Sequence, residues 1–584
     1  MAMELESPAT RKVAGRQAAV RAPVRAATRA APDPGAAWRD LDRLREAGIG
    51  RITGGLSPEA LALAWFDWAM HLAVAPGKRL QLALHDWSRP ADASADPRFS
   101  DPSWRLAPFD AMATAFLRCE DWWREATRGV PGTVPHHESV VAFASRQLLD
   151  MLSPSNLPWT NPQVVARTIG QGGRNLWAGA LHWMEDAARA AGLAADEEPR
   201  FVVGRDLAAT PGKVVMRNEL AELIQYAPAT GVVEAEPVLI VPAWIMKYYI
   251  LDLSAHDSLV RWLVGQGHTV FCLSWRNVDE SDRDLGMDDY RRLGVMAALD
   301  AVTRIVPGQR VHAAGYCLGG TLLAIAAAAM AGAGDDRLRS LTLFAAQTDF
   351  SEPGELALFI DPAQVHMLDS LMWLRGYLTA GQMSWAFQML RSNDLVWSRM
   401  VHEYLMGERP GSNDLMAWNA DATRMPYRMH SEYLHQLFLG NDLASNRYRV
   451  DGHRVMLQRL RLPVFVVGTE TDHVAPWRSV YKLHDLTDAP VTFVLCNGGH
   501  NAGIVNEPGH PHRHFRMATR TGGVARLSAD EWFEATSAQP GSWWTAWERW
   551  LVESGSHQRV PPPAMGAAGY PPIDDAPGRY VMER

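Results

Sequence analysis

Cysteine is scarce in this chain, and so are other features that would assign it to several common classes of protein. The 584 residues include four cysteines, which lie far apart and form no Cys-x-x-Cys pair: Cys119, Cys272, Cys317 and Cys496. This spacing argues against a zinc site and a disulfide framework, so we expect no metal and a reducing compartment, the cytoplasm. The chain also has no apolar run of 18 or more residues and no recognisable signal peptide, so we expect no membrane-spanning segment.

An excess of basic charge is missing as well. The formal net charge is −8, and no nucleic-acid-binding motif stands out, which excludes nucleic acid as an expected partner. A composition of 47% hydrophobic and 21% charged residues is typical of a globular protein. A chain of this length is too long for one ordinary core, so two or more domains with tails are predicted.

The first part of the chain divides into a tail and a helical domain. Residues 1–36 are rich in Ala, Arg and Pro and have little to bury, which predicts a disordered tail. A transit peptide has a similar composition, but Glu4 and Glu6 disfavour it. Residues 37–200 have helical periodicity, with Ser57 and Pro58 as a helix start and further helices expected around 109–127, 139–152 and 161–191.

From residue 201 to 584 strands alternate with helices, which predicts an α/β fold with a mostly parallel sheet covered on both faces. The expected strands lie near 213–217, 220–226, 238–242, 269–274, 310–315, 338–344, 463–468 and 491–496. The interval of about 350–450 is helical and rich in Trp, Met, Leu and Tyr. We expect it to be a cap inserted over the carboxyl edge of the sheet, where ligands bind in such folds.

A small-residue turn between the strand 310–315 and an Ala-rich helix marks the candidate nucleophile. Gly315 and Gly319 flank Cys317 in the Gly-x-nucleophile-x-Gly pattern of the α/β-hydrolase elbow. A buried cysteine between glycines is also a common small hydrophobe, so the elbow needs partners.

Two further residues complete a triad in the order of this fold. Asp472 follows the strand 463–468 and His500 follows the strand 491–496, which places both beside the elbow. Taken singly, Asp472 fits a turn or helix cap and His500 a loop histidine. With the elbow they predict a Cys-His-Asp triad, whereas His312, His510, His512 and His514 are expected in the core or on the surface.

From about residue 50 onward the chain resembles the poly(3-hydroxyalkanoate) synthases, acyltransferases that polymerise hydroxyacyl-CoA. The resemblance rests on several motifs: Thr53-Gly54-Gly55-Leu56-Ser57-Pro58, Pro76-Gly77-Lys78, Thr210-Pro211-Gly212-Lys213-Val214-Val215, Lys247-Tyr248-Tyr249-Ile250-Leu251-Asp252-Leu253, Ser274-Trp275-Arg276-Asn277, Gly315-Tyr316-Cys317-Leu318-Gly319-Gly320, Trp418-Asn419-Ala420-Asp421, Asp472-His473 and Gly499-His500. It implies an α/β-hydrolase fold with an inserted helical cap, and places nucleophile, carboxylate and base at Cys317, Asp472 and His500.

The resemblance also implies chemistry and partners. The substrate is expected to be an (R)-3-hydroxyacyl-CoA, most simply 3-hydroxybutyryl-CoA, with no cofactor beyond the CoA it carries. His500 would favour the thiolate of Cys317, and Asp472 would either orient His500 or help to activate the 3-hydroxyl of the incoming acyl group. The backbone N–H groups of Leu318 and Trp244 are expected to hold the oxyanion. The expected partners are the growing polyester, the granule surface, a second copy in a homodimer, and granule-coating proteins.

One segment departs from the family pattern, and two other functions remain open. Many short-chain-type synthases carry Pro-Pro-Cys-Ile-Asn before Lys-Tyr-Tyr, whereas this chain has Pro242-Ala243-Trp244-Ile245-Met246, which is expected to border the oxyanion site and to bear on substrate range. A thioesterase or other hydrolase would use the same triad and admit water. A non-catalytic granule-associated protein would keep the fold but would have no need of all three groups.

Overall fold

The structure is a computed structural model that describes residues 35–88, 92–191, 193, 200–390, 396–409, 411–521 and 526–584. The predicted tail, 1–36, lies outside the described residues except for its last two. By its backbone contacts the chain divides into two units, residues 1–42 and 43–584, and helix α1 (Ala36–Ile52) crosses that boundary.

Residues 43–191, called the helical region below, are helical as predicted. The longer helices after α1 are α2 (Pro58–Val74), α3 (Pro76–Ala83), α4 (Phe109–Ala126), α5 (Pro135–Met151), α6 (Pro162–Gly170) and α7 (Arg174–Ala190). The predicted start of α2 is confirmed, since the Ser57 side chain accepts a hydrogen bond from the N–H of Ala60 and Pro58 opens the helix. The single helix expected over 161–191 is wrong. Gly172 and Gly173, with φ of 59° and 84°, separate α6 from α7.

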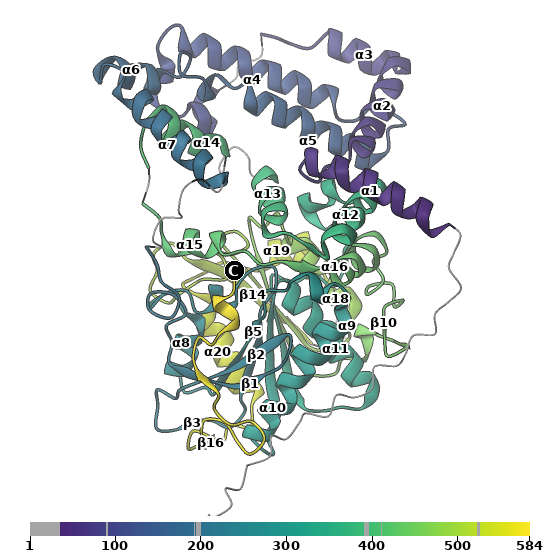
Figure 1. Cartoon of the computed structure of the whole chain (residues 1–584), viewed down its shortest axis with the longest axis vertical. Coiled ribbons are helices and arrows are strands. Elements are labelled where there is room, and N and C mark those ends of the chain that lie inside the picture. Colours follow the sequence, from purple (N-terminus) through teal and green to yellow (C-terminus); the bar gives the residue numbers. More distant parts are fainter. Residues whose placement is uncertain are drawn as a thin grey trace, which may run out of the picture. The chain divides into compact units, whose positions relative to one another are not determined.

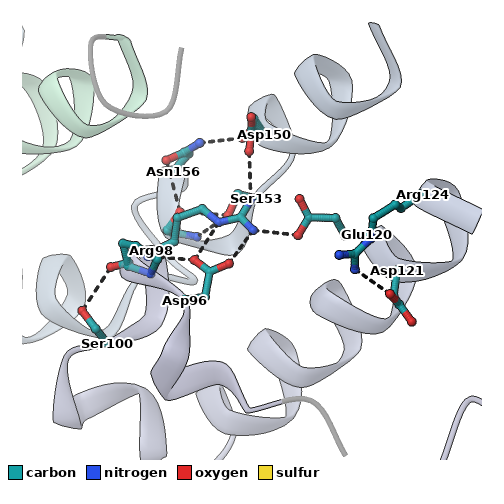
Figure 2. Close-up of polar contacts among 11 residues, drawn as sticks. Asp96, Arg98, Ser100, Glu120, Asp121, Arg124, Asp150, Ser153 and Asn156 are labelled. Carbon is teal, nitrogen blue, oxygen red and sulfur yellow. Dashed lines mark hydrogen bonds and ion pairs between the residues drawn. The ribbon is translucent and has the colours of Figure 1, made fainter. Parts of the chain in front are cut away.

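A buried arginine ties together three parts of the helical region. The guanidinium of Arg98 binds Asp96 beside it, Glu120 of α4 at 2.6 Å and Asp150 of α5 at 2.8 Å (Figure 2). The Arg98 side chain is only 10% exposed. Because removal of one partner would leave buried charges uncompensated, this network makes the packing of α4 and α5 depend on a single side chain.

Residues 200–584, called the α/β region below, are organised around one large sheet. Its strands, in spatial order, are β15 (Gln539–Pro540), β14 (His514–Arg520), β13 (Val491–Cys496), β12 (Val464–Thr469), β7 (Leu338–Phe344), β6 (Val311–Tyr316), β4 (Val238–Val241), β5 (Val270–Trp275), β2 (Ala221–Tyr226), β1 (Gly212–Arg217) and β17 (Asp574–Asp575). The six strands from β13 to β5 are parallel and the flanking strands are antiparallel. All eight predicted strands are confirmed to within a residue or two at their ends.

Alternation along the strands divides the core between the two faces of the sheet. In β12, Val464 and Val466 belong to one hydrophobic cluster, and Phe465 and Val467 belong to the other. Helices α10 (Ala297–Ile305) and α11 (Leu318–Ala333) pack on the first face, and α8 (Leu259–Gly265) and α20 (Trp543–Ser554) on the second (Figure 1). Strand β14 was not among the predicted strands, and its first residue, His514, was expected in the core or on the surface.

The chain between β7 and β12 forms the predicted helical insertion. Its main elements are η8 (Gly354–Phe359), α12 (Pro362–Arg375), α13 (Ala380–Leu390), α14 (Ser398–Met400), η10 (Val401–Leu405), α15 (Asp414–Ala420), α16 (Tyr427–Glu432) and η11 (Tyr433–Leu439). Leu371 and Met372 of α12 are buried, 3% and 0% exposed. Across the residues that the structure covers, no helix is both long and apolar enough to pass through a membrane.

Candidate active site

Cys317 occupies the elbow between β6 and α11 in a conformation that few side chains adopt. Its φ and ψ are 52° and −126°, and its N–H donates to the carbonyl of Phe344 on β7 at 2.8 Å. A non-glycine residue at positive φ carries backbone strain, which is typical of a functional turn. The residue is also the N-cap of α11, so the positive end of that helix favours a thiolate there.

The glycines of the elbow are required by close approach rather than by φ. A Cβ on Gly315 would lie 2.5 Å from the Cα of Gly320, and a Cβ on Gly319 would lie 2.4 Å from the carbonyl oxygens of Val241 and Pro242. Both contacts are with backbone, which cannot move aside cheaply. The Gly-x-Cys-x-Gly spacing therefore lets α11 start directly against the end of β4.

Asp472 is held by the loop that follows β12. Its carboxylate accepts hydrogen bonds from the N–H groups of Val474 and Ala475, both at 2.8 Å, and from the hydroxyl of Thr469 at 3.0 Å. Burial alone would raise the pKa of Asp472, but the charge of His500, its hydrogen bond and the two N–H groups outweigh burial and lower that pKa. Asp472 is thus an ionised carboxylate with a fixed orientation.

His500 follows β13 and connects Asp472 with Cys317. Its Nδ1 lies 2.7 Å from Oδ2 of Asp472, and its side chain also interacts with the Cys317 sulfur. Burial opposes a charged imidazole, yet the Asp472 carboxylate and the Cys317 thiolate together raise the pKa of His500 well above its usual value. The three predicted residues come together because β6, β12 and β13 are parallel and end at the same edge of the sheet.

Tyr316, which the sequence analysis did not single out, supports the histidine loop. Its hydroxyl donates to Oδ1 of Asn501 at 2.6 Å, and its ring lies 5.5 Å from the imidazole of His500 between centroids. Tyr316 could have been identified from the sequence by its position between Gly315 and Cys317, because a side chain at the end of this strand lies beside the nucleophile.

The segment 242–246, which was expected to border the oxyanion site, lies beside the elbow. The contact of Gly319 with Pro242 places it beside the first turn of α11, and Leu318, Ala243, Ile245 and Met246 share a cavity with Cys317. The Trp244 side chain is turned into the core, with its ring centroid 4.5 Å from that of Tyr290. The assignment of the Leu318 and Trp244 N–H groups to the oxyanion stays a prediction.

Two motifs that lie about 170 residues apart meet at this segment. The indole of Trp418 donates to the carbonyl of Lys247 at 2.8 Å, and the hydroxyl of Tyr249 donates to Asp421 at 2.8 Å. Thr423 also binds the 244–245 backbone, through its N–H to the Ile245 carbonyl at 3.1 Å. The end of the cap thereby holds the loop that lies beside Cys317.

A cavity of about 1330 Å³ opens above Cys317 and is enclosed largely by apolar side chains of the cap. Its wall includes Phe350, Phe359, Leu378, Trp385, Tyr433 and Phe438. His500 and His473 reach it from the sheet side, and Gly54, Gly55 and Leu56 reach it from the helical region. That Gly-Gly motif is held by Gln364 of α12, which donates to the carbonyl of Gly55 at 2.5 Å and accepts from the N–H of Ser57 at 2.8 Å.

The remaining candidate ligand groups lie elsewhere. Cys272 and Cys496 are buried in the sheet, where burial raises the pKa of each thiol, and Cys119 belongs to α4. Among the described residues, one group of potential metal ligands comes within 4.8 Å of one another: His85, Asp121 and Glu125. It lies in the helical region, where Glu125 binds His85 at 3.1 Å and Asp121 binds Arg124 at 2.5 Å.

The chain matches known families along most of its length. Residues 36–78 match the family described as poly-beta-hydroxybutyrate polymerase N terminal, residues 95–263 match poly-beta-hydroxybutyrate polymerase (PhaC) N-terminus, and residues 236–507 match the alpha/beta hydrolase fold. The last match and the strand order confirm the predicted fold class.

Curated relatives extend over more than four fifths of the chain. It is 41% identical over 490 residues to the poly(3-hydroxyalkanoate) polymerase of Methylorubrum extorquens, which covers 83% of this chain and 80% of that protein. It is 39% identical over 497 residues to the poly(3-hydroxyalkanoate) polymerase subunit PhaC of Rhizobium etli, with 84% and 77% covered. For the subunit PhaC of Cupriavidus necator, identity is 36% over 502 residues, with 84% and 83% covered.

Proposed function

Because the chain belongs to the poly(3-hydroxyalkanoate) polymerase family, we propose that it polymerises (R)-3-hydroxyacyl-CoA, most simply 3-hydroxybutyryl-CoA, into polyester with release of CoA. The observation that carries this proposal is a Cys-His-Asp triad at the base of a large apolar cavity covered by a helical cap. The triad supports acyl transfer through a thioester, and the apolar cavity supports the choice of a hydroxyl over water as the acceptor.

In the first step the Cys317 thiolate attacks the thioester carbonyl of the substrate. A bond forms between Sγ and the acyl carbon, the bond to the CoA sulfur breaks, and the CoA thiolate takes a proton from His500. One thioester replaces another, so the acyl group keeps its activation for the next transfer. A serine ester would lose that activation, which gives a chemical reason for sulfur at the elbow.

In the second step a hydroxyl oxygen attacks the acyl thioester on Cys317. The hydroxyl proton passes to His500, an ester bond forms and Cys317 returns to the thiolate. The Asp472 carboxylate binds Nδ1 of His500, which leaves Nε2 of His500 for these proton transfers. The N–H groups of Leu318 and Trp244 would stabilise the oxyanion in both steps.

The same cavity bears on the alternative of a thioesterase. Hydrolysis needs water at the acyl-cysteine, whereas the wall here is built mainly from aromatic and aliphatic side chains. We therefore favour the polymerase, which acts without a cofactor other than the CoA that the substrate carries.

The apolar product suggests a role for the exposed surface of the helical region. Leu63, Phe66, Met70 and Val74 follow one face of α2 and are 50–72% exposed. One face of α7 contacts the cap: Asn175 lies against Leu405, Gly179 against Tyr404 and His182 against Glu403. The opposite face of α7 is exposed and carries Trp177, Leu181 and Met184. We assign these two stripes to contact with the growing polyester and the granule surface, and expect a homodimer as the active form.

The direct test is CoA release and recovery of insoluble polyester from (R)-3-hydroxybutyryl-CoA. Cys317→Ala is expected to reduce both below about a hundredth of the parent value while the melting temperature stays the same, because it removes the acyl carrier. Cys119→Ala, outside the cavity, is the matched control and should keep full activity. CoA release with free 3-hydroxybutyrate in place of polymer would instead identify a hydrolase. If neither polymer nor free acid forms, the remaining alternative is a non-catalytic granule-associated protein.

A further inference from the structure

Three histidines outside the triad line the catalytic cavity, His402, His430 and His473, and of these His430 is buried. His430 belongs to α16 and is 3% exposed. Its ring centroid lies 5.9 Å from that of Tyr433, the first residue of the π-helical turn η11. Burial first, and then the charge on Cys317, raise the pKa of the Tyr433 phenol, so Tyr433 lies in electrostatic range of the sulfur. π-Helical turns occur often at functional sites.

One ring nitrogen of His430 has no hydrogen-bond partner among the described residues, and unlike His268, whose Nδ1 is also unpartnered, His430 lines the catalytic cavity. Nδ1 of His500 binds Asp472, and Nδ1 of His312 binds the Ser340 hydroxyl at 2.6 Å. Nδ1 of His430 is buried and has no hydrogen-bond partner among the described residues. Such a group lowers stability, because its lost hydrogen bond to water is not replaced. A protein that only had to fold would be better served there by leucine.

The imidazole is neutral in the free protein. Burial lowers the pKa of His430 to about 4, and no carboxylate opposes that effect. A neutral imidazole offers one hydrogen-bond donor and one acceptor. It can therefore bind an uncharged oxygen, either a carbonyl through its N–H or a hydroxyl through either nitrogen.

The surroundings of His430 restrict what that oxygen belongs to. The cavity residues near it in the chain are Tyr433, Leu434 and Phe438, so an acyl chain that enters meets mainly apolar side chains. An (R)-3-hydroxyacyl chain differs from a plain fatty acyl chain by its hydroxyl, and the growing polyester differs by its ester carbonyls. A hydrogen bond to either would select oxygenated chains.

We propose that His430 is a substrate-binding residue that hydrogen-bonds to an oxygen of the hydroxyacyl chain, and that it makes the cavity selective for oxygenated over plain acyl groups. This inference rests on the proposed function. The oxygen is either the 3-hydroxyl of the bound acyl group or an ester carbonyl of the growing polymer. A site that hydrogen-bonds a substrate oxygen rejects the analogue without it, because its own polar group is then left unpaired.

The test compares His430→Leu and His430→Gln with the parent enzyme. The substrates are (R)-3-hydroxybutyryl-CoA and butyryl-CoA, whose acyl group can reach Cys317 but has no hydroxyl. We expect kcat/KM for polymerisation to fall about 10- to 100-fold in His430→Leu, and less in His430→Gln, which keeps a donor and an acceptor. The first-turnover release of CoA from butyryl-CoA should change less than about twofold. His435→Gln, an exposed histidine of η11 bound to Asp369, is the control.

The first turnover separates the two oxygens. A loss already present in the first turnover with the hydroxy substrate identifies the 3-hydroxyl, and a loss that appears only during chain extension identifies the ester carbonyl. The melting temperature of His430→Leu should equal or exceed that of the parent, because an unpaired polar group is removed.

Three outcomes would overturn the proposal: no loss of activity, an equal loss with both substrates, or a loss that follows a lower melting temperature. If the parent protein makes no polymer at all, the proposed function fails and so does a role for His430 in chain extension. The first-turnover comparison of the two substrates still tests whether His430 binds the 3-hydroxyl.

Discussion

The helical region (43–191) and the α/β region (200–584) bury their side chains by different means. Strands of the α/β region carry long runs of buried residues on both faces, and the two resulting clusters contain most of the hydrophobic core. In the helical region the clusters are small, such as Phe99, Trp104 and Ala113, and a buried arginine with three carboxylates joins the helices. Most large exposed hydrophobic side chains of the described residues lie there too.

This difference suits the α/β region to catalysis and the helical region to contacts with external partners. A parallel sheet closed on both faces can hold a strained elbow and a buried ion pair in place, because neither can relax without breaking the core. A helix such as α7 can pack against the cap on one face and keep an apolar stripe on the opposite face for an external partner. We therefore expect changes in the α/β region to act on rate and those in the helical region to act on local stability or on binding.

The largest effect is expected from the triad. His500→Gln and Asp472→Asn should each lower kcat by about 10²- to 10⁴-fold. If His500 activates Cys317, His500→Gln should suppress the initial burst of CoA release. If Asp472 acts mainly in elongation, Asp472→Asn should still acylate Cys317 once and then stall. Rapid-quench measurement of CoA distinguishes these cases. An equal loss of both phases in both variants would give Asp472 a purely orienting role.

The same variants have a defined dependence on pH. The Asp472 carboxylate raises the pKa of His500, so Asp472→Asn lowers that pKa, and the positive charge beside Cys317 is then lost at a lower pH. Alkylation of Cys317 by iodoacetamide at neutral pH should be slower in this variant than in the parent, because the imidazolium that favours the thiolate is less populated.

The contributions of His500 and Asp472 to folding stability also depend on pH, in the directions set by their pKa shifts. The contribution of His500, whose pKa is raised, is complete below about pH 6.5 and is lost as the pH rises through the raised value. That of Asp472, whose pKa is lowered, is complete above about pH 4 and is lost as the pH falls through the lowered value.

An intermediate effect is expected from Arg98→Leu. It leaves Glu120 and Asp150 without their buried cation, which should destabilise the helical region by about 3–5 kcal/mol. Hydrogen exchange should speed up in α4 and α5 and stay slow in β6, β12 and β13. Arg124→Leu, which removes an exposed ion pair with Asp121, is the matched control and should cost less than about 1 kcal/mol. Uniform loss of protection in both regions would show that they unfold as one.

The smallest effect on the enzyme is expected from the exposed stripe of α2. Phe66→Ser with Val74→Ser should change the free energy of unfolding by about 0.5 kcal/mol or less, because neither side chain is buried. Co-sedimentation with polyester granules should fall, while CoA release in the first turnover stays at the parent level. The cap residue pair Leu371→Ser and Met372→Ser, buried instead of exposed, should unfold the insertion rather than alter binding selectively. Unchanged sedimentation of the α2 variant would reject the stripe as a polyester contact.

The abundance of apolar residues in the cap does not mean an excess of exposed apolar surface there. Leu371 and Met372 are buried and Trp385 lines the cavity; Phe387 lies among the side chains that are not described. Composition counts apolar side chains without saying which way they face. The excess lies on α2 and α7, where the spacing of Leu63, Phe66, Met70 and Val74 was visible but equally consistent with a buried face.

The sequence by itself determined where the strands lie along the chain and where the elbow lies, because short apolar runs and the spacing of Gly315, Cys317 and Gly319 are local properties. It also predicted Asp472 and His500, since residues after parallel strands meet at one edge of a sheet. Only the tertiary structure decided what encloses the site. The lack of a partner for His430, the support of Gly55 by Gln364 and the hold of Trp418 on Lys247 depend on contacts between segments that are far apart in the chain. No local pattern records such contacts, because they arise when the cap folds over the sheet.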